Sequence, residues 1–310
     1  MADVQDVLIV GGGAAGYTAG IFAARDRCRA LLLEKFSAGG QVLNCEHITN
    51  FPGFPQGVAG YTLGPLLQEQ ATAAGLQVAM NEVTAVRRDG DLFLVETDGG
   101  SHATRTLIVA SGSRFAALGI PGEEEFVGRG ISHCASCDGS FFMQKPVIVV
   151  GGGDAAVDEA LHLTQYASSV TVVHRRDRLR ACASLQERAR SERKVSFRWN
   201  ASPRAIEGAD GVERVQVEDL TTGRTDAVPA SGVFVYAGLT PNTELLGGLV
   251  PLDARGQIVT DLRMRTRVPG VLAAGDVRAE SARQLVTSAG DGATAALAAV
   301  EYLRDKRWAV

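Results

Sequence analysis

Two cysteines separated by two residues form the most reactive motif of the sequence. They are Cys134 and Cys137 in the segment CASCDG, and Asp138 follows the second cysteine directly. Cysteines at this spacing bind a metal ion, form a structural disulfide, or make and break a disulfide during a reaction. An aspartate beside them can exchange a proton with a thiolate when a disulfide opens, and it also suits the turn before Gly139.

The rest of the sequence favours the redox interpretation of this pair. A closed zinc site needs about four ligands, but the other cysteines, Cys28, Cys45 and Cys182, are scattered singly. A purely structural disulfide across so short a loop would remove little chain entropy. Five cysteines, an odd number, also do not resemble a secreted disulfide framework. We therefore expect one cysteine of the pair to attack and the other to resolve, with no metal ion.

Two similar segments indicate which elements position the pair. DVLIVGGGAAGYTAGIFAAR lies near the N-terminus, and PVIVVGGGDAAVDEALHLTQ begins at residue 146. Each has a β-branched run, a glycine cluster, and then small and apolar residues at helical spacing, which is typical of a dinucleotide-binding βαβ unit. The matching positions are Gly11, Gly13 and Gly16 in the first segment and Gly151, Gly153 and Ala156 in the second.

The residues that end the second strand of each unit predict different nucleotides. Glu34 lies 23 residues after Gly11, and His174 lies 23 residues after Gly151, so the two occupy the same place in their units. An acidic residue there accepts hydrogen bonds from a free ribose, as in FAD or NAD. His174, Arg175 and Arg176 instead offer positive charge to the 2′-phosphate of NADP. A flavoprotein reductase needs both nucleotides in one chain.

The order of the segments predicts an α/β fold of two Rossmann-like, three-layer ββα nucleotide-binding domains, the second inserted in the first. We expect residues 1–115 and 246–310 to bind FAD, and residues 116–245 to bind NADPH and carry the cysteine pair. A short helix over 64–75 should have Pro65 near its start. Residues 76–100 alternate like a β-meander. The last segment, 270–303, should be a strand and a long helix that return to the first domain.

Composition narrows the class of protein further. The chain has 310 residues, 45% of them hydrophobic, and a formal net charge of −4. Mild acidity argues against a nucleic-acid partner. No segment approaches the roughly 18 apolar residues of a membrane-spanning helix, and the acidic segment MADVQD lacks the positive charge of a signal peptide. We expect a cytoplasmic protein without nucleic-acid or membrane partners.

Taken together, the motifs resemble those of the low-molecular-weight bacterial thioredoxin reductases over essentially the full length. The matching segments are GGGAAG, GGQ with NFPGF, CASCDG, GGGDAAVDEAL, HRRDRLRA, AAGDV and RQLVTSAGDGATAAL. The resemblance implies a homodimeric FAD protein that uses NADPH to reduce thioredoxin or a thioredoxin-like dithiol protein through a Cys134–Cys137 disulfide, with Asp138 as the acid.

The resemblance also implies the binding residues. Those for FAD would be Gly11, Gly13, Ala14, Ala15, Glu34, Gly40, Gln41, Asn50, Val83, Ala110, Gly275, Asp276, Arg283 and Gln284. Those for NADPH would be Gly151, Gly153, Asp154, Ala155, His174, Arg175, Arg176 and Arg180. Two residues depart from the family pattern: His133 precedes the cysteine pair, and Asp291 puts a charge in a segment that is usually neutral near the flavin.

Three other functions share these features. A dithiol oxidase would pass electrons through flavin to oxygen and would not need the second glycine motif. A reductase of the same design could serve another acceptor, such as a glutaredoxin-like protein, a peroxidase component or a small disulfide. A non-catalytic nucleotide-binding sensor would only register redox state through its cysteines.

Overall fold

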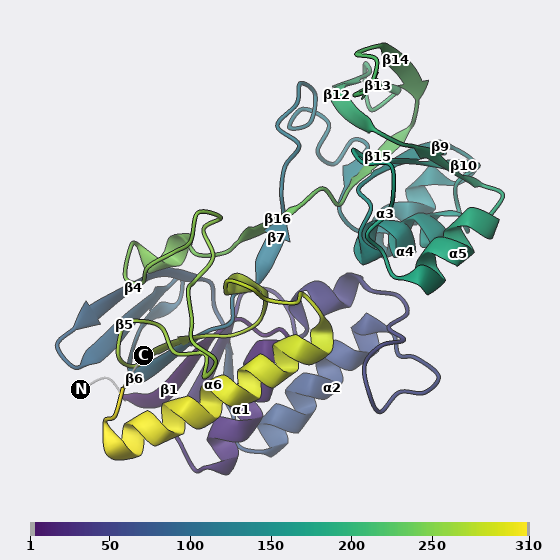
Figure 1. The fold of residues 1–310 in the computed structure, drawn as a ribbon. Helices are drawn as coiled ribbons and strands as arrows, with labels where there is room; N and C mark the ends of the chain where they lie inside the picture. Colours follow the sequence, from purple (N-terminus) through teal and green to yellow (C-terminus); the bar gives the residue numbers. More distant parts are fainter. Residues whose placement is uncertain (1–3, 309–310) are drawn as a thin grey trace. The chain divides into compact units, whose positions relative to one another are not determined.

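The structure, a computed structural model, describes residues 4–308 (Figure 1). The chain divides into two compact units. The first contains the residues up to Arg114 and those from Thr240 onward, and the second is Phe115–Leu239. The two connecting segments pair as short strands, β7 (Ser113–Phe115) and β16 (Leu239–Pro241). The second unit is therefore an insertion in the first, as the sequence predicts.

The core of the first unit is a parallel sheet with the order β3-β2-β1-β6, and β17 pairs with β6. Its strands are β1 (Gln5–Val10), β2 (Ala30–Glu34), β3 (Gln77–Met80), β6 (Gly100–Val109) and β17 (Val271–Ala273). Strands β1, β2 and β17 are almost entirely buried, which explains their continuous apolar runs. The pairing of β17 with β6 confirms that the last segment returns to the first unit.

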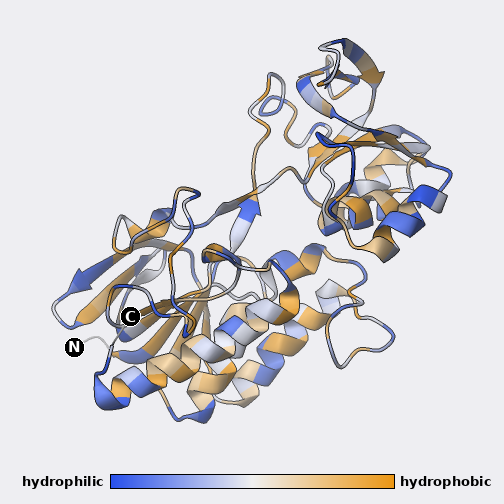
Figure 2. Ribbon diagram, in the orientation of Figure 1, coloured by the Kyte–Doolittle hydropathy of each residue, from blue (hydrophilic) through white to orange (hydrophobic). Residues whose placement is uncertain are grey.

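The expected β-meander is only partly correct. Strand β3 pairs in parallel with β2, so it belongs to the central sheet. Only β4 (Val83–Asp89) and β5 (Leu92–Thr97) form an antiparallel hairpin, which continues into β6. Alternation alone does not distinguish a parallel edge strand from a hairpin strand. Figure 2 shows hydrophobic residues on the central strands and hydrophilic ones at the end of β4.

Three helices of the first unit are α1 (Ala14–Arg25), α2 (Gly60–Ala73) and α6 (Leu285–Asp305). Helix α6 lies alongside α1 (Figure 1). A Cβ at Gly292 would come within 2.1 Å of the Ala15 carbonyl oxygen, so small residues are required there. Helix α2 begins at Gly60 rather than near Pro65, because a residue without Cβ can start the helix against the Val42 carbonyl.

The second unit has a fully parallel sheet with the order β11-β10-β9-β15-β8. Its strands are β8 (Ile131–Ser132), β9 (Pro146–Val150), β10 (Ser169–Val173), β11 (Val195–Arg198) and β15 (Gly232–Val235). A separate antiparallel sheet contains β12 (Ala201–Glu207), β13 (Arg214–Asp219) and β14 (Thr225–Pro229). The helices are α3 (Ala135–Asp138), α4 (Asp154–Leu163) and α5 (Ala183–Ser191). The predicted fold class, two Rossmann-like units, is confirmed.

Candidate active site

The cysteine pair lies immediately after β8, in the second unit. Cys134 and Cys137 form a disulfide whose Cα atoms are 5.3 Å apart. Cys134 is the residue before α3, and its sulfur accepts a hydrogen bond of 3.2 Å from the Cys137 N–H. Cys137 is exposed and Cys134 half-buried. A disulfide that solvent can reach on a short surface helix is open to attack by an external thiolate.

Polar groups around the pair hold it in place. Asp138 accepts a 2.6 Å hydrogen bond from the Ser132 hydroxyl, and the same hydroxyl oxygen accepts 3.0 Å from the Cys134 N–H. His133 contacts the Val235 carbonyl through Nδ1 at 2.9 Å, and its ring stacks on Phe115. His133 therefore donates a hydrogen bond from Nδ1 to a backbone oxygen. It packs against Phe115 in addition to preceding the cysteine pair.

The first glycine turn lies between β1 and α1. Two of its three glycines have no space for a side chain, and the third has open space beside it. A Cβ at Gly11 would lie 2.4 Å from the Ala110 carbonyl oxygen, and one at Gly12 would lie 2.9 Å from the Glu34 carboxylate. A Cβ at Gly13 would meet nothing closer than 4.0 Å. The open position lies at the start of α1, where backbone N–H groups favour a pyrophosphate. These residues fit a bound dinucleotide.

The second glycine turn, between β9 and α4, repeats this arrangement. A Cβ at Gly152 would lie 2.4 Å from the His174 ring. Gly152 therefore faces His174 in the second turn as Gly12 faces Glu34 in the first turn. A Cβ at Gly153 would lie 4.0 Å from its nearest neighbour, a guanidinium nitrogen of Arg180. The open side of this turn thus faces a cation, which suits an anionic ligand.

His174 differs in one respect from what the sequence suggests. Its ring is buried, and burial lowers its pKa, assisted by the charges of the nearby arginines. Its Nε2 donates to the Arg178 carbonyl oxygen at 3.0 Å. His174 is therefore neutral at pH 7 and holds the loop in place, so it does not supply the expected positive charge. Arg175 and Arg176, which follow it directly, are exposed cations.

Glu34 ends β2 beside the first glycine turn. Its carboxylate accepts the Gly12 N–H at 2.6 Å and the Phe36 N–H at 2.9 Å, and it is buried. Burial, with the Glu34 charge as a smaller cause, raises the pKa of Tyr17 to about 12. Parallel pairing of β2 with β3 places Met80 opposite Glu34, so the β3–β4 turn that leads to Val83 lies at the end of β2. A 2.6 Å salt bridge joins Lys35 and Glu82 across the same place.

Most of the other predicted FAD residues gather at the carboxyl ends of the parallel strands, where open α/β sheets bind ligands. A Cβ at Gly40 would lie 3.6 Å from the Gly13 Cα. The Asn50 amide donates to the Gln284 side chain at 3.2 Å, although the two are far apart in sequence. Ala14, Ala15, Ala110, Gly275 and Asp276 lie at or beside these strand ends, and Arg283 directly precedes Gln284.

Asp276 is a half-buried acceptor at this place. It accepts hydrogen bonds from the Ser281 hydroxyl at 3.1 Å and from the Ser288 hydroxyl at 3.3 Å. Burial nevertheless raises its pKa. A desolvated carboxyl of this kind favours a ligand that donates hydrogen bonds, such as the hydroxyls of a ribityl chain.

The remaining predicted NADPH residues lie on the same side of the second unit. The Arg180 N–H donates to the Gly152 carbonyl at 2.7 Å, so the loop after β10 is fixed to the glycine turn. Asp154 accepts the Cys182 N–H at 2.7 Å and thereby holds the next part of this loop. Ala155 is exposed in the first turn of α4.

An ion pair that the sequence does not predict lies beside the predicted FAD site. Asp291 on α6 accepts hydrogen bonds from the Arg278 guanidinium at 2.7 and 2.9 Å, and from the Gly275 N–H at 3.2 Å. Both side chains are largely buried, 16% and 10% exposed. Asp291 thus anchors the turn that presents Asp276. The sequence shows Asp291 as one acidic residue among glycines and alanines, but it does not show that Arg278 is its partner.

Replacing Asp291 with alanine should weaken this turn. It leaves the Arg278 charge without its partner, and removing one member of a buried pair costs about 3 kcal/mol. We expect the free energy of unfolding in urea to fall by about that amount, and flavin to be lost on dialysis. Asp305→Ala, at the end of the same helix, is the control and should change neither. Unchanged stability and flavin content in the Asp291 variant would show that the pair does not anchor the turn.

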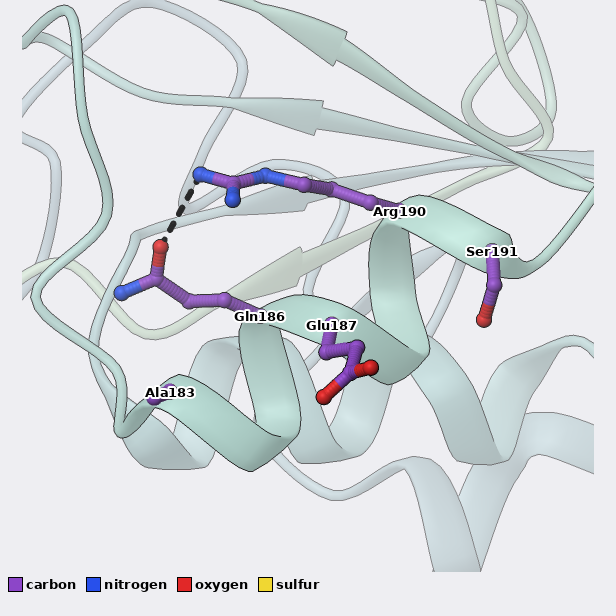
Figure 3. Close-up of a pocket in the computed structure, with 5 residues that line it drawn as sticks. All are labelled: Ala183, Gln186, Glu187, Arg190 and Ser191. Carbon is purple, nitrogen blue, oxygen red and sulfur yellow. Dashed lines mark hydrogen bonds between the residues drawn. The ribbon is translucent and has the colours of Figure 1, made fainter.

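Two further features contribute little to a site. Within residues 4–308 no group of three or more His, Cys, Asp or Glu side chains could hold a metal ion, and no helix of this part is long and apolar enough to cross a membrane. Figure 3 shows the side chains of Ala183, Gln186, Glu187, Arg190 and Ser191, which line a shallow hollow on α5. All five residues belong to this one helix.

Comparison with known proteins gives consistent results over the whole chain. Residues 5–293 match the family model described as pyridine nucleotide-disulphide oxidoreductase. The thioredoxin reductase of Treponema pallidum (strain Nichols) is 43% identical over 298 residues, which cover 96% of this chain and 97% of that protein. That of Bacillus subtilis (strain 168) is 40% identical over 303 residues, covering 97% and 96%.

Solved structures agree with these similarities. The crystal structure of Lactococcus lactis thioredoxin reductase superposes with a TM-score of 0.94 at 41% identity, covering 96% of this chain and 99% of that one. The structure from T. acidophilum gives a TM-score of 0.92 at 34% identity, covering 96% and 98%. The resemblance that the sequence motifs indicated is confirmed.

Proposed function

The chain belongs to the pyridine nucleotide-disulphide oxidoreductase family, and from this premise we propose that it is a flavoprotein disulfide reductase of the thioredoxin reductase type. Electrons would pass from NADPH through FAD to the Cys134–Cys137 disulfide, and then to thioredoxin or a thioredoxin-like dithiol protein. We further propose that the first unit binds FAD and the second binds NADPH.

One observation carries the proposal. Two glycine turns in a single chain have the same open third position, but acidic Glu34 follows one and the exposed Arg175 and Arg176 follow the other. An acidic residue repels a phosphate on the ribose and arginines attract it. The first turn therefore suits FAD and the second suits NADPH, and the redox disulfide lies in the second unit.

Each part of the site has a role in moving electrons. FAD, when bound, can accept a hydride and pass on an electron pair. Reduction of the disulfide consumes two electrons and two protons and yields two thiols. Asp138 directly follows Cys137 and is hydrogen-bonded to Ser132, so it is held beside the sulfurs as their proton donor and acceptor. Exposed Cys137 leaves the pair accessible to the disulfide of a protein substrate.

The family resemblance also supports a homodimer. Several large apolar side chains of the first unit are exposed, including Tyr61 on α2 and Leu297 on α6. A contact with a second copy would cover exposed apolar side chains on these helices. Light scattering of the purified protein should give twice the mass of the 32.6 kDa chain.

The function is tested by adding NADPH to the purified yellow protein without oxygen. We expect the flavin absorbance to bleach, and reduction of a panel of thioredoxins, glutaredoxins and small disulfides to proceed fastest with a thioredoxin. A flavin that bleaches with a dithiol but not with NADPH would identify a dithiol oxidase. A colourless protein that takes up no flavin would rule out both enzymes and leave the sensor interpretation.

A further inference from the structure

A buried carboxylate lies directly behind the cysteine pair. Glu159 on α4 is 8% exposed, and its Oε2 accepts a 2.8 Å hydrogen bond from the Ala135 N–H. Ala135 follows Cys134 in the chain and is itself completely buried. Glu159 shares its helix face with Ala156, Ala160 and Leu163, which belong to the hydrophobic core. A carboxylate among these positions costs free energy unless it is hydrogen-bonded or paired, and the Ala135 N–H supplies one such hydrogen bond.

The negative charge of Glu159 acts on its neighbours. The hydroxyl of Tyr236 is buried, and its pKa is raised first by burial and then by the charge of Glu159, with a smaller contribution from Asp138. A like charge nearby disfavours any group that becomes negative on losing its proton. A thiolate formed in the pair would experience the same repulsion.

The other charged groups around this point are few. The neighbouring strands β9 and β10, PVIVV and SVTVV, carry none. Asp138 and His133 flank the cysteines themselves. Helix α4 carries three other charged or titratable residues, Asp154, Asp158 and His162. Helix α5, which packs against α4, carries Glu187, Arg188 and Arg190. None of these six residues is buried. Glu159 is therefore the one deeply buried charge that these elements bring to the pair.

We propose that Glu159 is a positioning residue that also keeps the reduced cysteine pair strongly reducing. It holds the backbone behind Cys134 through the Ala135 N–H, and its charge disfavours the thiolates of the reduced form. A pair whose reduced form is less stable gives up its electrons more readily. This inference rests on the proposed redox role of Cys134 and Cys137. It adds that Glu159, on α4, lowers the reduction potential of this pair.

The Glu159→Gln variant separates charge from hydrogen bonding. The glutamine oxygen can still accept the Ala135 N–H, but the charge is gone. Equilibration of the purified flavoprotein with reduced and oxidised dithiothreitol measures the effect: the protein disulfide gains two electrons and two protons, and dithiothreitol closes to its cyclic disulfide. Trapping with an alkylating reagent and mass analysis of the Cys134–Cys137 peptide give the fraction reduced. We expect the variant to favour the reduced form.

The pH dependence distinguishes an electrostatic role from a structural one. Ordinary cysteine thiols ionise near pH 8.5, so fewer thiolates form at low pH and the charge of Glu159 should matter less there than at high pH. The ratio of variant to wild-type equilibrium constants should be close to one at pH 6 and rise to about tenfold at pH 9.5, which corresponds to about 30 mV. Dithiothreitol ionises identically in both samples and cancels from the ratio.

Two controls make every outcome informative. Glu187→Gln removes an exposed carboxylate from α5 and should leave the ratio at one. Glu159→Asp keeps the charge and should stay within about twofold of the wild type at all pH values. A Glu159→Gln ratio that stays at one, or that is equally large at pH 6 and pH 9.5, would overturn the inference. If dithiothreitol cannot reduce the wild-type pair at all, the proposed function fails instead.

Discussion

A Cys137→Ser variant is expected to lose reduction of its disulfide acceptor by at least about 10³-fold, while NADPH still bleaches its flavin. Without the second sulfur the pair cannot form the disulfide that accepts two electrons, so the path from flavin to acceptor is interrupted. The serine is nearly isosteric and the residue is exposed, so the fold should be unaffected. Anaerobic stopped-flow absorbance measures flavin reduction, and steady-state NADPH oxidation with thioredoxin measures the whole path.

The matched control is Cys182→Ser, which removes an exposed cysteine of the same unit that forms no disulfide. It should keep at least half of the wild-type rate in both assays. Substantial thioredoxin reduction by the Cys137 variant would mean that electrons leave the flavin by another route. Loss of flavin bleaching in that variant would mean that the cysteine supports nicotinamide binding as well.

The features that sequence predicts well are those that depend on local rules. A glycine cluster between a β-branched run and an apolar helix specifies one kind of turn, wherever it occurs. The equal spacing of 23 residues predicted that Glu34 and His174 occupy the same place, and the structure puts each against the middle glycine of its own turn. The cysteine pair was identified in the same way, because its chemistry depends mainly on its own spacing.

The features that sequence missed depend on tertiary packing. The partner of Asp291 is Arg278, and no spacing rule connects a loop residue to one in the second turn of the following helix. The carboxylate of Glu159 becomes important only because α4 packs against the short helix that carries the cysteines. Strand β3 joined the parallel sheet through its register with β2, which alternation of residue types does not specify.

The neutral state of His174 has the clearest functional consequence among these differences. Three cations are expected from the sequence at the proposed 2′-phosphate site. Burial lowers the pKa of the histidine, however, and its ring packs against Gly152. The first turn uses a charged Glu34 at the equivalent place, so the two turns share a geometry without sharing a charge. Under the proposed function, the exposed Arg175 and Arg176 would therefore select the nucleotide in the second turn.

Replacing both Arg175 and Arg176 with alanine should accordingly remove most of the preference for NADPH over NADH. Hydrogen bonds to a charged group contribute about 1.5–3 kcal/mol each. Losing two of them should lower the ratio of kcat/KM values for NADPH and NADH by about 10²–10⁴-fold. The loss should appear mainly in the KM for NADPH, because NADH has no 2′-phosphate for the arginines to bind. Steady-state kinetics with each nucleotide and a fixed thioredoxin concentration measures this ratio.

The control for this pair is Arg190→Ala, which removes an exposed arginine from α5 that is hydrogen-bonded to Gln186. Its nucleotide preference should stay within about twofold of the wild type. Because His174 is neutral at pH 7, the wild-type preference should also change little between pH 7 and pH 8.5, where a charged histidine would have lost its proton. A double variant that still prefers NADPH strongly would place the phosphate on other cations, and a preference that fell across this pH range would mean that His174 carries charge after all.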